Sequence, residues 1–196
     1  MLIAFTGQAR SGKDTVAKFV RSWDPDYEHI LFAGPLKAMI RTLFIEAGYS
    51  EEEAEDYING DRKMEPLELF QGKTTRYAMQ TLGTEWRNFF GPNLWSDIID
   101  TQVSEAECVT ITDMRFLHEE AFVDDRDGWK VRTRRFGQMK SKDPHPSEQE
   151  MEAIKAHYTI FNYGTLADLE SAAELVFTAL NMPHRSLADA AEMLYS

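Results

Sequence analysis

The first sixteen residues, Met1 to Val16, constrain the fold more than any other part of the chain. They begin with a short apolar run, Leu2–Phe5, which is long enough for a buried strand. The segment Gly7–Lys13 then reads G-x-x-x-x-G-K, and helical spacing follows from Thr15 to Val20. A strand, a glycine loop and a helix in this order are the context that a phosphate-binding loop requires. The sequence therefore predicts an α/β fold that binds a phosphate group at this loop.

The residue types in the loop suit this chemistry. Backbone N–H groups that turn inward form an anion site, and the positive end of the following helix faces the same point. Gly7 and Gly12 permit a close approach that a Cβ atom would obstruct, and Lys13 brings a charge to the β- and γ-phosphates. The alternative is an ordinary glycine turn between a strand and a helix. The agreement of the spacing, the lysine and the flanking elements favours the phosphate-binding loop.

One position departs from the usual pattern of this motif. The residue after the lysine is normally Ser or Thr, which ligates Mg²⁺, but here it is Asp14, followed by Thr15. A carboxylate beside a triphosphate repels it unless a cation lies between them. We therefore expect Asp14 to hold Mg²⁺ directly or through its waters, and Thr15 to contact the phosphates. The alternative is that Asp14 only complements the helix dipole.

The size, net charge and cysteine content of the chain exclude or disfavour several classes of function. The chain has 196 residues, 43% of them hydrophobic, which supports one globular domain over 1–196. Its 33 acidic and 21 basic residues give a net charge of -12, which disfavours binding to duplex nucleic acid or to an anionic membrane surface. The single cysteine, Cys108, excludes an internal disulfide and indicates a reducing compartment. Without a membrane span or a secretion signal, we expect a cytoplasmic location, and a homodimer remains open.

Predicted strands and helices alternate along the chain. The expected strands are Leu2–Phe5, His29–Ala33, Cys108–Thr112, Trp129–Arg134 (with one polar face) and His157–Asn162. The expected helices are Lys13–Ser22, 35–47, one starting at the cap Ser50, Thr74–Phe90, 92–103, Phe116–Val123, Leu166–Leu180 and Ser186–Leu194. The stretch Asn59–Lys73 has weak periodicity and receives no assignment, and the polar, proline-containing stretch Gly137–Glu148 is expected to be a mobile loop. This alternation predicts a parallel sheet covered by helices on both faces.

Charged residues follow several of the predicted strands. The glycine loop, Lys37 and Asp113 each come after a strand end. Because ligands of such sheets bind outside the carboxyl ends of the strands, these residues can converge on one crevice.

Several further motifs now form a set. They are A-G-P-L-K at 33–37, M-Q-T-L-G-T-E-W at 79–86, P-N-L-W at 92–95, T-D-M-R-F at 112–116 with Glu119, H-P-S-E at 145–148 and N-Y-G-T at 162–165. In this order the chain resembles the bacteriophage deoxynucleoside monophosphate kinases, a branch of the P-loop NTPase fold, from Leu2 to about Val176. Phosphomevalonate and dephospho-coenzyme A kinases share the loop and a similar P-L-K, but not the Q-T-L-G-T-E-W run.

The resemblance implies transfer of the γ-phosphoryl group of ATP to a deoxynucleoside 5′-monophosphate (dNMP), with Mg²⁺ as cofactor. The implied fold is an α/β/α three-layer P-loop NTPase with a small lid. The acceptor would bind a helical segment at about 36–105, and the lid loop would lie at about 136–148. Both substrates are anionic, so cations must lie around the reacting phosphates.

The site residues follow from the loop motif and the resemblance together. The implied catalytic residues are Arg10, Lys13, Asp113 and Arg115. The implied ATP-binding residues are Gly7, Ala9, Arg10, Ser11, Gly12, Lys13, Asp14 and Thr15. The implied acceptor-binding residues are Arg10, Lys37, Arg76, Gln80, Gly83, Thr84, Trp95, Arg115 and Glu119, and the implied metal ligands are Asp14 and Asp113.

Alternatives remain open for some of these residues. Asp113 and Arg115 could form a structural ion pair at the strand end, and Trp95 could be a core residue instead of a stacking partner for a base. The basic residues Arg132, Arg134 and Arg135 either serve a lid over ATP or form a solvated strand face. Arg87 follows the Q-T-L-G-T-E-W run where the resemblance leads us to expect glycine, which leaves the local geometry of the acceptor site open.

Two other functions compete with the implied one. The chain could phosphorylate a different small phosphorylated acceptor, or it could be a non-enzymatic nucleotide-binding module. A switch of the GTPase type would normally carry N-K-x-D, which the sequence lacks. Neither the base of the acceptor, ordinary or modified, nor the role of His145 can be read from one sequence.

Overall fold

The computed structural model of the chain describes residues 1–138 and 146–181. By its internal contacts the chain divides into two compact units: the first joins Met1–Leu31 to the residues from Gln102 onward, and the second is Phe32–Thr101. The second unit covers most of the stretch, 36–105, that the sequence analysis assigns to the acceptor. That assignment stays a prediction, as does the lid at 136–148, of which residues 139–145 lie outside the described part.

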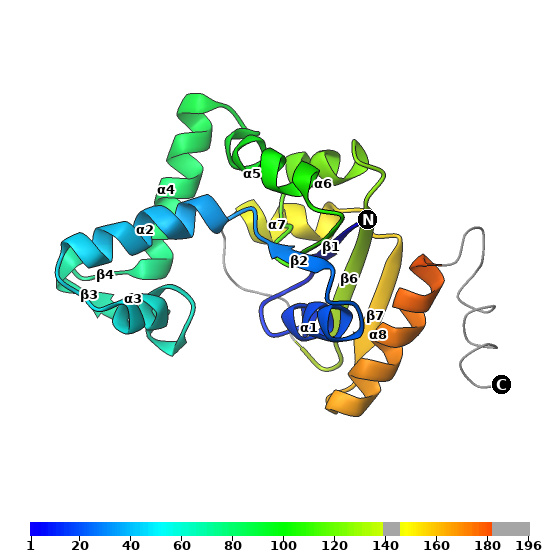
Figure 1. Cartoon of the computed structure of the whole chain (residues 1–196). Helices are drawn as coiled ribbons and strands as arrows, with labels where there is room; N and C mark the ends of the chain where they lie inside the picture. Colours follow the sequence, from blue (N-terminus) through cyan, green and yellow to red (C-terminus); the bar gives the residue numbers. More distant parts are fainter. Residues whose placement is uncertain (139–145, 182–196) are drawn as a thin grey trace. The chain divides into compact units, whose positions relative to one another are not determined.

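The first unit is built on a five-stranded sheet. Its strands are β1 (Leu2–Thr6), β2 (Tyr27–Ile30), β5 (Cys108–Ile111), β6 (Trp129–Arg135) and β7 (Tyr158–Asn162). They are all parallel, in the order β2-β5-β1-β6-β7 (Figure 1). This confirms the predicted parallel α/β sheet, with β1 at its centre and the glycine loop at the carboxyl end of β1.

The second strand begins earlier than expected. The sequence predicted His29–Ala33, whereas β2 pairs Tyr27 with Cys108 and ends opposite Ile111. Tyr27 is only 3% exposed, because its ring packs into the core beside Phe177. Since β5 ends at Ile111, residues beyond Ile30 have no strand to pair with. The other four strands match the predicted bounds to within one residue.

Helices cover both faces of this sheet. Figure 1 shows α1 (Lys13–Trp23) and α8 (Leu166–Leu180) side by side on one face, with α6 (Leu117–Asp124) and α7 (Pro146–Ala153) on the other. The apolar side chains of β1, α1 and α8 form one continuous core. At the start of α8, the hydroxyl of Thr165 accepts a hydrogen bond from the Asp168 N–H at 3.1 Å and so caps the helix. The predicted helix Ser186–Leu194 lies outside the described residues.

The alternation in β6 was read correctly, but the first part of its polar face, Lys130 and Arg132, is buried, whereas Arg134 is exposed. Lys130 and Arg132 are 4% and 6% exposed. The Lys130 ammonium group pairs with Glu120 at 3.0 Å and Asp124 at 2.6 Å. Arg132 donates to main-chain oxygens at the end of α7, so for this residue the solvated face is wrong, while a role in a lid stays untested. Opposite-charge partners and carbonyl groups allow the basic side chains to be buried.

A helix replaces part of the predicted mobile loop. The sequence analysis expected a loop from Gly137 to Glu148, but α7 begins at Pro146. Its apolar residue Met151 is fully buried, and Ile154, just after the helix, is 3% exposed. These two residues lie three positions apart, which places them on one side of the turn and fastens α7 to the unit.

The second unit is mainly helical. It contains α2 (Gly34–Glu46), α3 (Glu51–Ile58) and α4 (Thr75–Phe90), and α5 (Leu94–Glu105) begins in it. The predicted cap at Ser50 is confirmed as a reciprocal capping box with Glu53. The unassigned stretch holds two 3-10 turns, Asp61–Met64 and Glu68–Phe70, and a short antiparallel pair, β3 (Pro66–Leu67) with β4 (Lys73–Thr74).

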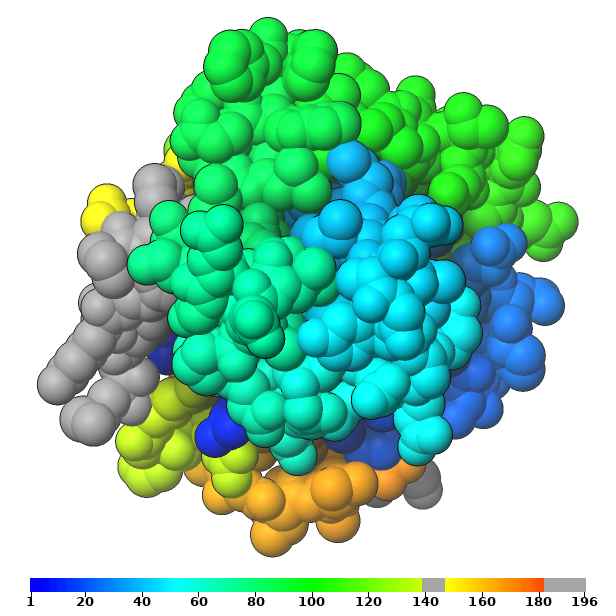
Figure 2. All heavy atoms as spheres, turned by 90° about the vertical axis from the view of Figure 1, so that its left-hand side faces the viewer, coloured from blue at the N-terminus to red at the C-terminus, as the bar shows by residue number. Residues whose placement is uncertain are grey.

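A small aromatic core holds this unit together. The ring of Phe44 stacks on Tyr57 and meets Tyr49 and Phe70 edge-on. Figure 2 shows the outer surface of the unit, where α3 (cyan) and the turn after it lie side by side. Among the described residues of the whole chain, no helix is long and apolar enough to cross a membrane.

Candidate active site

The glycines of the loop are required by its geometry. Gly7 and Gly12 have φ angles of 144° and 107°, which favour glycine. A Cβ atom on Gly7 would lie 2.4 Å from the carbonyl oxygen of Thr133, so no other residue fits there without moving β6. Arg10 also adopts a positive φ, 63°, and its side chain is exposed. The loop therefore has the left-handed turns that the motif predicts.

Three side chains from later in the chain hold this loop. The hydroxyl groups of Ser11 and Thr133 are 2.7 Å apart. Asn162 donates from Nδ2 to the carbonyl oxygen of Ser11 at 3.0 Å, and Gln138 donates from Nε2 to that of Ala9 at 2.6 Å. Because the Ser11 side chain is buried against Thr133, its predicted contact with ATP would come from its backbone. These bonds fix the path of the loop.

Lys13 lies buried at the start of α1, with 6% of its surface exposed. Burial lowers the pKa of its ammonium group below the usual 10.5, and the charge of Arg115 lowers it further. The charges of Asp14, Asp113 and Glu148 act in the opposite direction. A phosphate group would be a much stronger partner for this lysine than the carboxylate of Asp14, 3.8 Å away.

The carboxyl end of β5 brings further charges to Lys13. Arg115 forms an ion pair through Nη1 with Oε1 of Glu148, on α7, at 2.5 Å. The Arg115 side chain is 24% exposed and that of Glu148 only 8%. Since β5 is the parallel neighbour of β1, Asp113 and Arg115 follow β5 at the edge of the sheet where the loop with Lys13 follows β1, and Glu148 joins them through its ion pair with Arg115.

The predicted residues Glu119 and Asp14 differ in their surroundings, because the first is buried and the second is exposed. The Glu119 carboxylate accepts hydrogen bonds from the backbone N–H groups of Arg115 at 2.6 Å and Phe116 at 3.0 Å. It therefore caps α6 and fixes the backbone of Arg115, while its predicted contact with the acceptor stays untested. Asp14 carries an exposed side chain, 66% accessible, at the mouth of the loop.

The acidic residues fit a loosely held Mg²⁺. In the described part of the chain, no three His, Cys, Asp or Glu side chains gather in a way that could hold a metal by themselves. Mg²⁺ in nucleotide sites keeps several waters and binds one or two carboxylates together with substrate phosphates. Asp14 and Asp113, both within electrostatic range of Lys13, match that requirement.

The remaining acceptor residues lie in the second unit. Arg76, Gln80, Gly83 and Thr84 follow helical spacing on α4, which places them on one side of that helix. Gly83 packs closely there, since a Cβ atom on it would lie 3.4 Å from Leu36, the neighbour of Lys37. Trp95 donates from Nε1 to the Gly83 carbonyl at 3.1 Å. The predicted residues of this unit thus surround one short segment of α4.

Trp95 is buried, in agreement with the core alternative. It is 7% exposed, and its ring stacks on Trp86 with centroids 6.0 Å apart. One face of the ring is therefore occupied, and stacking of the other face on a base stays a prediction. Arg87, where glycine was expected, donates from Nε to the same Gly83 carbonyl at 3.0 Å.

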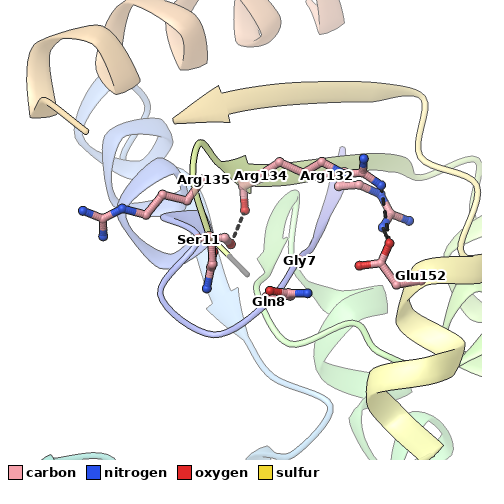
Figure 3. Close-up of a pocket in the computed structure, with 9 residues that line it drawn as sticks. Gly7, Gln8, Ser11, Arg132, Arg134, Arg135 and Glu152 are labelled. Carbon is pink, nitrogen blue, oxygen red and sulfur yellow. Dashed lines mark hydrogen bonds and ion pairs between the residues drawn. The ribbon is translucent and has the colours of Figure 1, made fainter. Parts of the chain in front are cut away.

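A pocket of about 210 Å³ opens beside the glycine loop. It is lined by Gly7, Gln8, Ser11, Arg132, Thr133, Arg134, Arg135, Gln138 and Glu152. Figure 3 shows the guanidinium groups of Arg132 and Arg134 turned toward Glu152, whereas Arg135 points the other way. The pocket borders the loop on the β6 side.

Sequence reasoning missed four residues that support the loop and Arg115. They are Thr133, Gln138, Glu148 and Asn162. Glu148 and Asn162 both lie in motifs of the family resemblance, which was the available signal. Thr133 and Gln138 carry no such signal, because their contacts are with residues more than a hundred positions away.

Comparisons with known proteins found a family model and a relative that each match more than half of the chain. A family model described as "Deoxynucleotide monophosphate kinase" matches residues 49–173. A protein of Acanthamoeba polyphaga mimivirus, described as "Putative deoxynucleotide monophosphate kinase", is 30% identical over 172 residues. That match covers 80% of this chain and 85% of the viral protein.

Solved structures resemble the chain more distantly. TT1252 from Thermus thermophilus aligns with 93% of this chain and 98% of its own, at 20% identity and a TM-score of 0.48. Dephospho-CoA kinase from Campylobacter jejuni aligns with 91% of this chain and 96% of its own, at 14% identity and a TM-score of 0.49. Shikimate kinase from Acinetobacter baumannii aligns with 94% of this chain and 95% of its own, at 13% identity and a TM-score of 0.45.

Proposed function

The chain belongs to the deoxynucleotide monophosphate kinase family, and from this premise we propose that it transfers the γ-phosphoryl group of ATP to a deoxynucleoside 5′-monophosphate. The products would be ADP and the deoxynucleoside diphosphate. The observation that carries the proposal is the buried Lys13 in a glycine loop, beside Arg115 and Asp113 at the end of the neighbouring strand.

The loop and its lysine would bind the donor. Inward N–H groups and the start of α1 would stabilise the triphosphate. Lys13 would contribute a positive charge that is largely desolvated, because its side chain is buried. Phosphate binding would favour the protonated state of Lys13, since an adjacent anion raises the pKa that desolvation lowers. Mg²⁺, held by Asp14 and Asp113 with the phosphates, would supply charge neutralisation when bound.

Arg115 would act on the reacting phosphates. A guanidinium group binds two phosphate oxygens at once in fork geometry. The ammonium group of Lys13, in contrast, acts as a point charge. Arg10, at the exposed tip of the loop, would contact the acceptor phosphate. Phosphoryl transfer needs positioning and charge neutralisation more than covalent chemistry, so these cations would do most of the catalysis.

The acceptor nucleoside would bind the second unit. Polar groups of Arg76, Gln80 and Thr84 share one side of α4, and Trp95 forms a wall near Gly83. Lys37, one residue after the Leu36 that packs at Gly83, would contribute a further cation. This part of the proposal rests on the spacing of these residues and on the family.

A panel of acceptors tests the proposal. Purified protein with ATP and Mg²⁺ is supplied with the common dNMPs, modified-base dNMPs, phosphomevalonate or dephospho-coenzyme A, and formation of ADP is measured. We expect stimulation by at least one dNMP and none by the other two acceptors. Stimulation only by a non-nucleotide acceptor, or no stimulation of folded protein by any acceptor, would overturn the proposal.

A further inference from the structure

Glu148 pairs directly with Arg115, a residue of the proposed reaction centre, and the proposed mechanism gives Glu148 no role. Its carboxylate is 2.5 Å from Nη1 of Arg115, and its side chain is only 8% exposed. We propose that Glu148 is a positioning residue, which holds the Arg115 guanidinium beside Lys13 in the orientation that binds the acceptor phosphate. The kinetic consequence rests on the proposed function, whereas the placement of Arg115 does not.

The ion pair is held rigidly at its carboxylate end. Arg132, buried on β6, donates from Nη2 to the carbonyl oxygens of Met151 at 3.1 Å and Ile154 at 2.6 Å. On the same helix, Glu150 accepts from the backbone N–H of Leu117 at 3.1 Å. These bonds fasten the middle and the C-terminal end of α7 to the unit, and Glu148 lies in the first turn, two residues before Glu150.

The guanidinium end is fixed at its backbone. The Glu119 carboxylate accepts from the N–H groups of Arg115 and Phe116, so the segment that carries the arginine is tied to the first turn of α6. Only the side chain of Arg115 is left to be oriented. A long arginine side chain loses much of its rotamer entropy when it becomes fixed. The ion pair with Glu148 fixes the Arg115 side chain before the substrate binds, so this entropy is not lost on binding. This is the general advantage of preorganised binding groups.

The ion pair leaves most N–H donors of Arg115 available for other partners. A guanidinium group has five N–H donors, so one bond through Nη1 is compatible with a fork onto phosphate oxygens. The pair also contributes little as a purely structural device, since desolvation of two charges largely cancels their attraction. Its geometry favours a role in placing Arg115.

The kinetic test compares two equal charge changes on one helix. Glu148→Gln removes the charge and keeps the shape, and Glu150→Gln does the same two residues away while keeping an oxygen for Leu117. We expect Glu148→Gln to raise the KM for the dNMP by about tenfold, because the neutral amide accepts only a weaker hydrogen bond from Arg115 than the carboxylate does, with the KM for ATP changed less than threefold. Glu150→Gln should behave as wild type, and both should melt within about 2 °C of each other.

A double variant separates positioning from general damage. If Glu148 acts through Arg115, then Arg115→Lys combined with Glu148→Gln should lose no more acceptor kcat/KM than Arg115→Lys alone. Fully additive losses, or a Glu148→Gln enzyme with the same constants as Glu150→Gln, would overturn the inference.

An activity-independent measurement keeps the inference testable if no dNMP is phosphorylated. The Nε–Hε signal of Arg115, assigned by its loss in Arg115→Lys, reports the mobility of the guanidinium group by nitrogen-15 relaxation. We expect an ordered group in the wild type and in Glu150→Gln, and a mobile one in Glu148→Gln. An Arg115 signal that stays equally ordered in Glu148→Gln would contradict the inference whatever the enzyme's substrate.

Discussion

Lys13 is buried, although the Asp14 carboxylate 3.8 Å away is exposed, and this burial has a consequence for stability. Its lowered pKa means that, between that pKa and 10.5, the unfolded chain binds more protons than the folded one. The free energy of unfolding should therefore rise with pH across this window, and the charge destabilises the fold at neutral pH. Such a cost is typical of functional residues.

Replacing the lysine should therefore separate stability from activity. We expect Lys13→Met to raise the free energy of unfolding at pH 7 by on the order of 1 kcal/mol and to reduce phosphoryl transfer by about 100-fold or more. Urea unfolding and steady-state kinetics measure the two effects. Lys18→Met, at an exposed position of the same helix, is the control and should change neither quantity. A destabilised Lys13→Met protein would contradict the assignment of Lys13 as a ligand-binding charge.

Asp14 offers a test of the metal role. We expect Asp14→Asn to lower turnover and to raise the Mg²⁺ concentration for half-maximal rate severalfold, because a neutral amide binds Mg²⁺ more weakly than a carboxylate. Asp26→Asn, an exposed aspartate in the turn after α1, should leave both unchanged. Unchanged Mg²⁺ dependence in Asp14→Asn, with only a small loss of stability, would assign this residue to the helix dipole.

At the scale of elements, Arg132 on β6 holds α7 in place. Its guanidinium group satisfies two carbonyl oxygens at the end of that helix. We expect Arg132→Met to lower the free energy of unfolding by about 2–4 kcal/mol, since buried carbonyls would lose their donor. Arg134→Met, whose guanidinium is exposed and 3.4 Å from Glu152, should cost less than about 0.5 kcal/mol in the same urea titration. Equal effects of the two substitutions would show that α7 is not held by Arg132.

His157, the residue before β7, should make the free energy of unfolding depend on pH in the acidic range. Burial, with a smaller effect from the Lys130 charge, lowers the pKa of His157 below 6.5, and its Nδ1 accepts from the Lys130 N–H at 3.0 Å. Between that lowered pKa and 6.5 the unfolded chain binds more protons, so stability should fall as the pH drops through this window. His157→Asn, which can still accept the hydrogen bond, should flatten that part of the stability profile. A profile with the same slope in the variant would assign the acid sensitivity to other groups.

The elements that could be predicted from the sequence are those whose signals are local. The strand–loop–helix unit at the N-terminus and α8 were predicted closely, because the apolar spacing and the cap at Thr165 lie within the elements themselves. Arg132 and α7 were not predicted, because a basic residue in a strand reads as solvated unless its partners are known. Those partners, Met151 and Ile154, lie 19 and 22 residues away. Glu148 was overlooked for the same reason, since its partner Arg115 is 33 positions earlier.

For the whole molecule, the acidic net charge of -12 makes local cations decisive. Two anionic substrates would approach an acidic chain, so only concentrated positive charge can bind them. Lys13 and Arg115 provide that charge in the first unit, and Lys37 and Arg76 are the predicted contributors in the second. The predicted ATP-binding residues thus lie in the first unit, and the predicted acceptor-binding residues are divided between the two units.

The transfer of phosphorus itself tests the central claim most directly. ATP labelled with phosphorus-32 at the γ-position is incubated with the protein, Mg²⁺ and each dNMP in turn, and the products are separated by chromatography. The account predicts that, for at least one dNMP, label appears in the deoxynucleoside diphosphate in a one-to-one ratio with ADP, and that Lys13→Met abolishes it. ADP that forms without any labelled deoxynucleoside diphosphate, or no ADP at all across common and modified dNMPs, would contradict it.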